Sequence, residues 1–131
     1  MPAMSFEEVQ EFLTKTADSM PAAIYNKLNG GIILVPETKL HPESRGDTLY
    51  ILGQYHYEPR GFGRYITIYY GSFCQVCANR TRRMQEQKLR EVLQHELVHH
   101  LEHQAGDKSL EIKDAVDIAR YKRRRPGEDK E

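Results

Sequence analysis

The stretch VLQHELVHHL, residues 92–101, holds two histidines four residues apart, with a glutamate directly after the first. Apolar residues surround these three positions, as on a helix that packs against a core. Helical spacing extends from about residue 81 to residue 105, and Gly106 suits the end of the helix. We therefore expect one long helix that carries His95, Glu96 and His99 next to the protein interior.

The spacing of the two histidines is typical of a metal site on a helix. Histidines four residues apart lie about 40° apart around a helix axis, so both side chains can hold one ion. A catalytic zinc site has three protein ligands and one water. The pattern predicts His95 and His99 as Zn²⁺ ligands, and Glu96 as the general base that deprotonates the water. His100 points about 100° away from His99 and is expected to be a polar packing residue.

The third ligand must come from outside the motif. Glu102 and His103 lie on roughly the right face, but about 7.5–9 Å farther along the helix axis. If the chain doubles back as an antiparallel helix, it regains the level of the metal between Glu111 and Asp114. We predict Glu111 as the third ligand and Asp114 as the residue that orients a ligand histidine, with Asp107 and Glu102 as alternatives. The alternative, which stays open, is that Glu111 and Asp114 are ordinary solvated carboxylates.

The rest of the sequence predicts a single α+β domain over residues 1–120 and a polar, frayed tail over 121–131. A capping box formed by Ser5 and Glu8 starts the first helix. We expect a small three- to four-stranded sheet packed on the long helix, and a returning C-terminal helix. The predicted helices are 6–19, 21–28, 72–79, 81–105 and 108–120; the predicted strands are 32–35, 48–55 and 64–70, with a loop at 37–47.

Composition limits the partners. The chain has 131 residues, of which 39% are hydrophobic and 29% charged, a balance typical of a folded domain. Its 19 basic and 19 acidic residues cancel, so net charge indicates neither nucleic acid nor an anionic membrane as a partner. The apolar runs are too short to cross a bilayer, and the N-terminus lacks the features of a secretory signal. We expect a cytoplasmic monomer.

Cys74 and Cys77 have the spacing of a metal knuckle or a redox pair. No second cysteine pair exists to complete a four-thiolate site. In the expected cytoplasmic setting both are predicted to be reduced, packing inward on the short helix. A redox-sensitive thiol pair is the alternative.

In these features the chain resembles the small bacterial zincin-like metallopeptidases, sometimes called minimal zincins. The resemblance covers about residues 5–118. It rests on FEE at residues 6–8, ILGQY at 51–55, ITIYYG at 66–71 and HELVHH at 95–100, with its doubled histidine. It implies a compact zincin fold, with His95 and His99 as metal ligands and Glu96 as general base. After His100 this chain departs from many members of the family, so the resemblance does not assign the acidic third ligand.

The resemblance also bears on the substrate. In zincins an edge strand beside the active-site helix typically holds an extended peptide, and Tyr65, Tyr69 and Tyr70 are expected to line that cleft. Their alternative role is packing in the core.

The leading functional hypothesis is a zinc-dependent peptidase that acts on a peptide or small protein. A zinc-stabilised binding or regulatory protein with weak or no turnover is the alternative, and it would tolerate loss of Glu96. A toxin–antitoxin or stress-regulatory component is a third possibility, which no residue supports.

Overall fold

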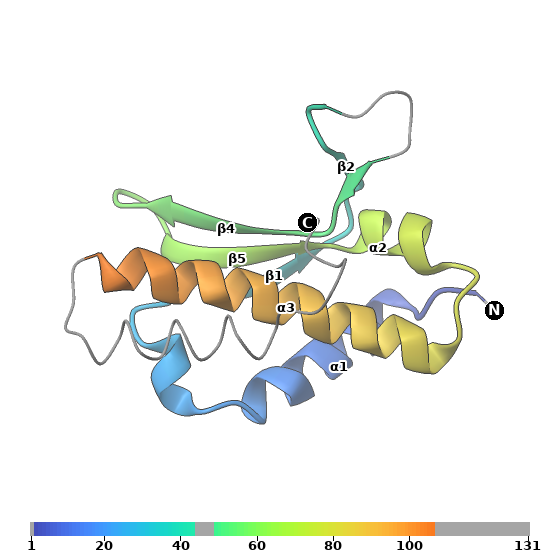
Figure 1. The fold of residues 1–131 in the computed structure, drawn as a ribbon, viewed down its shortest axis with the longest axis horizontal. Coiled ribbons are helices and arrows are strands. Elements are labelled where there is room, and N and C mark those ends of the chain that lie inside the picture. The colour runs from blue at the N-terminus through green and yellow to red at the C-terminus, as the bar shows by residue number, and fades with distance from the viewer. Residues whose placement is uncertain (1, 44–48, 107–131) are drawn as a thin grey trace.

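The computed structural model describes residues 2–43 and 49–106 of the chain. Its helices and strands form an α+β fold, as the sequence predicted (Figure 1). The predicted helix 108–120 and the tail 121–131 lie outside the described residues. The elements are α1 (Phe6–Asp18), η1 (Ala22–Tyr25), β1 (Gly31–Val35), β2 (Lys39–Leu40), β3 (Tyr50–Ile51), β4 (Gly53–Glu58), β5 (Gly63–Tyr69), α2 (Tyr70–Cys77) and α3 (Arg82–Ala105).

The first helix starts at the predicted capping box. The Ser5 hydroxyl accepts a hydrogen bond from the Glu8 backbone N–H at 3.1 Å. In return, the Glu8 carboxylate accepts from the Ser5 N–H at 2.9 Å. Val9 and Leu13 on the inner face of α1 are buried. Local sequence thus both starts this helix and directs its apolar side to the core.

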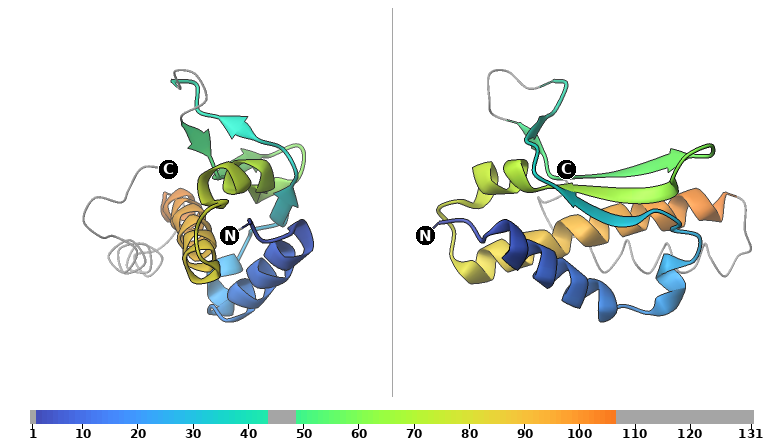
Figure 2. Two further views of the ribbon diagram at one scale, coloured as in Figure 1. Left: turned by 90° about the vertical axis from the view of Figure 1, so that its right-hand side faces the viewer. Right: turned by 180° about the vertical axis from the view of Figure 1, so that it is seen from behind.

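The main sheet has three strands in the order β1-β5-β4, with β1 parallel and β4 antiparallel to the central β5. Figures 1 and 2 show α1 and α3 on the same face of this sheet. Ile66 and Ile68 of β5 point to that face and are 0% and 1% exposed. Tyr65 and Tyr69 alternate with them and lie on the other face. The strand predicted at 64–70 is therefore present as β5, with side chains that alternate between the two faces.

The strand predicted at 48–55 is divided in two. Tyr50–Ile51 forms β3, which pairs with β2 in a separate two-stranded sheet. The strand β2 lies within the segment 37–47, which was predicted as a loop. Gly53–Glu58 forms β4 of the main sheet. Leu52 separates them: its side chain is 3% exposed, and its carbonyl accepts a hydrogen bond from the Tyr69 N–H at 2.8 Å. Burial of Leu52 fixes the point where the chain passes from one sheet to the other.

Helix α3 lies across the main sheet and closes the core. Its N-cap is Thr81, whose hydroxyl accepts from the Met84 N–H at 3.1 Å. Leu89 and Leu93 are at most 1% exposed. The buried Gln85 side chain accepts a hydrogen bond from the Met4 N–H at 2.8 Å and so ties the start of the chain to α3. Among the helices of the described residues, none is long and apolar enough to cross a membrane.

Candidate metal and catalytic site

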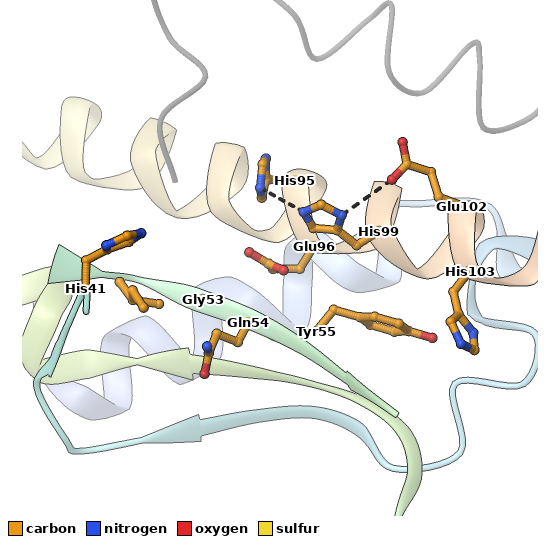
Figure 3. Close-up of a pocket in the computed structure, with 10 residues that line it drawn as sticks. His41, Gly53, Gln54, Tyr55, His95, Glu96, His99, Glu102 and His103 are labelled. Atoms are coloured by element: carbon orange, nitrogen blue, oxygen red, sulfur yellow. Dashed lines mark hydrogen bonds and ion pairs between the residues drawn. The ribbon is translucent and has the colours of Figure 1, made fainter. Parts of the chain in front are cut away.

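A cavity of about 580 Å³ lies between α3 and the strand β4 (Figure 3). His95, Glu96 and His99, the three residues of the predicted motif, all line it. Its other lining residues come from the β2–β3 region, from β4 and from the next turns of α3: His41, Ile51, Gly53, Gln54, Tyr55, Glu102 and His103. The fold therefore brings the motif together with residues that are remote in sequence.

The two histidines present their outer nitrogens to each other. Nε2 of His95 and Nε2 of His99 are 3.1 Å apart, and the two rings are almost perpendicular, with an interplanar angle of 87°. Two imidazole nitrogens bound to one tetrahedral zinc at about 2.0–2.1 Å would be about 3.3 Å apart. The pair thus fits a zinc ion with only a small adjustment of the side chains.

Glu102 lies behind His99. Its Oε1 is 3.4 Å from His99 Nδ1, the ring nitrogen that faces away from His95. A carboxylate in this place favours the tautomer with the proton on Nδ1, which leaves the Nε2 lone pair directed at the metal position. Of the two roles that the sequence left open for Glu102, this geometry matches the orienting one.

Glu96 is held in the narrow space between α3 and β4. The residue is 3% exposed, and Figure 3 shows its carboxylate directed into the space beside His95. Gly53 makes this close approach possible: a Cβ atom there would lie 2.8 Å from Val92 Cγ1 and 3.2 Å from Glu96 Cγ. Sequence reasoning did not single out Gly53, although a glycine inside a strand pattern is a known sign of close backbone approach.

A buried polar network fixes α3 against the rest of the protein. His100 is fully buried, and its Nε2 is 2.9 Å from the Asn26 carbonyl, to which it donates. Its Nδ1 accepts from the Tyr55 hydroxyl at 2.8 Å. Gln104, one turn later, also donates to the Asn26 carbonyl, at 2.6 Å. The prediction that His100 is a polar packing residue is confirmed.

Burial shifts the pKa values of two groups in this network, His100 and Tyr55. Removal from water disfavours the charged ring and lowers the pKa of His100 below its ordinary value. Burial also raises the pKa of Tyr55 to about 12. Both groups are therefore neutral at pH 7, as the hydrogen bond between them requires.

The far end of the cavity is aromatic and basic. His103 Nδ1 accepts a hydrogen bond from Arg64 Nε at 3.2 Å. The Arg64 guanidinium lies over the Tyr57 ring, 4.7 Å from its centroid, and Tyr57 in turn contacts His103. His103 is thus part of the wall, away from the pair of Nε2 atoms.

The three tyrosines predicted to line a substrate cleft are not among the residues that line this cavity. Tyr65 and Tyr69 belong to the central strand, on the sheet face away from α3, and donate their hydroxyls to side chains of β4. Tyr70 begins α2, and its hydroxyl donates to the Met4 carbonyl at 2.7 Å. Strand alternation explains the outcome, because β5 directs its isoleucines, not its tyrosines, to α3. The tyrosine that lines the cavity is Tyr55, on the edge strand.

The predicted acidic ligands Glu111, Asp107 and Asp114 lie outside the described residues. Within residues 2–43 and 49–106, no group of three His, Cys, Asp or Glu side chains could hold a metal ion. The predicted ligands within the described part of the chain are His95 and His99, and Glu111 as the third stays a prediction.

The cysteines lie away from this cavity. Cys77 is in the core at 2% exposure, and Cys74 is partly buried. The predicted inward packing on the short helix α2 is confirmed for Cys77.

Comparison with protein-family models gives no match, and comparison with curated proteins gives none either. Among solved structures, the chain is similar to a conserved hypothetical protein from Thermus thermophilus. The two share 31% sequence identity with a TM-score of 0.67, over 79% of this chain and 100% of the other. The description of that protein states no activity, metal or partner.

Proposed function

This chain belongs to the same family as the conserved hypothetical protein from Thermus thermophilus, and we propose from its site that it is a zinc-dependent peptidase. One observation carries the proposal. Two histidine Nε2 atoms lie 3.1 Å apart in a cavity that also contains the carboxylate of the next residue, Glu96. Two imidazoles and an adjacent carboxylate are the groups that metal-assisted peptide hydrolysis needs on a single helix.

Four residues of the cavity have a role in this proposal. His95 and His99 hold the metal, and Glu102 orients His99. When bound, zinc lowers the pKa of a water toward about 7 and polarises the peptide carbonyl. Glu96 takes the proton from that water and gives it to the amine that leaves.

The cavity also suggests how a substrate binds. β4 lines it through Gly53, Gln54 and Tyr55, and in the described part of the chain β4 pairs with β5 along one edge only. The other edge offers backbone donors and acceptors to an extended peptide. We propose an extended peptide or a flexible protein segment as substrate, a cytoplasmic setting and a monomeric enzyme.

The test is cleavage of a peptide library by zinc-loaded wild type and by Glu96→Gln, with bound zinc measured in both. Glu96→Gln keeps the size of the side chain and removes the base. We expect it to retain zinc and to lose about 10²–10⁴-fold in kcat. If Glu96→Gln cleaves as fast as wild type, the assigned mechanism is wrong. If zinc-loaded wild type cleaves nothing, the chain is a zinc-binding module.

A further inference from the structure

His41 is a cavity residue that the motif does not include. It follows β2 in the chain and lines the same cavity as His95 and Glu96. Figure 3 shows it beside β4, across the cavity from α3, with the outer part of its ring directed toward His95 and Glu96. A bound substrate would therefore lie between His41 and the catalytic helix.

A backbone hydrogen bond determines which nitrogen of His41 carries the proton. His41 Nδ1 accepts from the Glu43 backbone N–H at 3.0 Å. In a neutral imidazole with Nδ1 as acceptor, the proton is on Nε2. Nε2 then presents an N–H to the cavity, not a lone pair. This makes His41 a hydrogen-bond donor and distinguishes it from the ligand pair, whose Nε2 atoms face each other at 3.1 Å.

Three other residues that line the cavity, Glu102, Tyr55 and His103, are poorly suited to this donor role. Glu102 contributes a carboxylate, which accepts, and Tyr55 already donates its hydroxyl to His100. His103 has its Nδ1 occupied by Arg64 in the same way, so it is also a donor. It lies seven residues after Glu96, however, which is about 10.5 Å along the helix axis.

We propose that His41 is the oxyanion donor of this site: its Nε2–H donates to the oxygen of the scissile carbonyl as negative charge develops there. The inference rests on the proposed peptidase function. A fixed donor aimed at developing charge lowers the barrier without reorganising, and loss of one such donor typically costs about 10²–10³-fold in kcat. His41 touches the reacting atoms in this scheme, but it does not hold the metal.

His103→Ala is the matched control for His41→Ala, because both residues line the cavity and both have Nδ1 occupied. We expect His41→Ala to retain zinc and to lose about 10²-fold in kcat, with KM changed less than about 3-fold. His41→Gln, which keeps an N–H donor, should recover part of the loss. His103→Ala removes a donor farther from Glu96, so it should lose clearly less kcat than His41→Ala does.

Two readouts do not depend on turnover. Nitrogen-15 NMR of the metal-free protein should show His41 with its proton on Nε2. Zinc-loaded His41→Ala should bind a phosphinic peptide, a mimic of the tetrahedral oxyanion, about 10²-fold more weakly than wild type does. In the Glu96→Gln background, the same His41 change should alter the affinity for an uncleaved peptide by less than about 3-fold.

Three results would overturn the assignment. They are a proton on Nδ1, loss of zinc from His41→Ala, and an unchanged phosphinic peptide affinity. If wild type binds zinc but cleaves no peptide, the proposed function fails and the oxyanion role fails with it. The tautomer and the phosphinic peptide affinity then decide only whether His41 donates a hydrogen bond into the cavity.

Discussion

The hydrogen bond between Tyr55 and His100 offers a direct test of how helix α3 is held against β4. Tyr55→Phe removes one hydroxyl and keeps the ring in place. The His100 Nδ1 atom, which accepts from that hydroxyl at 2.8 Å, then loses its donor inside the core. A buried acceptor without a partner costs about 1–3 kcal/mol. For a domain of this size we expect a loss of Tm of about 4 °C for each kcal/mol, or about 4–12 °C in total.

Urea denaturation and thermal melting followed by circular dichroism measure this change. Tyr57→Phe is the matched control, because Tyr57 lies two residues away on the same strand and is 47% exposed. The control should stay within about 0.5 kcal/mol of wild type. If Tyr55→Phe is as stable as the control, the polar network does not hold α3 against β4, and our account of the positioning of the site is wrong.

Three further predictions concern packing, metal affinity and pH. Gly53→Ala forces a methyl group against Val92 and the stem of Glu96, so it should destabilise the fold by about 1–3 kcal/mol and lower kcat; denaturation and peptide cleavage measure the two effects. Glu102→Gln weakens the group that orients His99 and should reduce zinc affinity about 10–100-fold in a competition titration with a chelator. Burial lowers the pKa of His56 below its ordinary value of 6.5, so the unfolded chain binds the proton more readily than the native chain below pH 6.5. The free energy of unfolding should therefore fall as pH decreases from 7.5 to 5.5, and His56→Gln should reduce that slope.

The packing and metal-affinity predictions each have a control variant. For Gly61→Ala the one close neighbour of the new methyl group is the flexible Glu58 Oε1, at 2.9 Å, so stability should change by less than about 0.5 kcal/mol. Glu11→Gln removes an exposed carboxylate on α1 and should leave zinc affinity unchanged. If a variant and its control change stability or zinc affinity by the same amount, the structural reason given for that prediction is wrong. An unaltered pH slope in His56→Gln would show that another group causes it.

The long periodic segments could be predicted from the sequence because their signals are local. The capping box of Ser5 and Glu8, the alternation in β5 and the apolar stripe of α3 all depend on residues within a few positions of one another. The strands β2 and β3 have two residues each, too short for any period to show. The break at Leu52 depends on burial against the rest of the core, which is a property of the whole fold.

The same distinction explains which site residues could be predicted. His95, Glu96 and His99 lie within one and a half turns of a helix, so their spacing alone brings them together. His41 and Tyr55 reach the cavity only through the pairing of strands and the crossing of α3 over the sheet. The tyrosines of β5 do not line the cavity, because their strand lies at the centre of the sheet and directs them to the face away from α3. Residue type alone could not indicate that position.

The central claim is that His95 and His99 hold zinc together. X-ray absorption at the zinc edge of the purified, zinc-loaded protein measures the ligand atoms directly. We predict two imidazole nitrogens in a shell of nitrogen and oxygen atoms at about 2.0–2.2 Å, without sulfur. A sulfur shell at about 2.3 Å, as Cys74 and Cys77 would give, or the absence of imidazole scattering, would contradict the account.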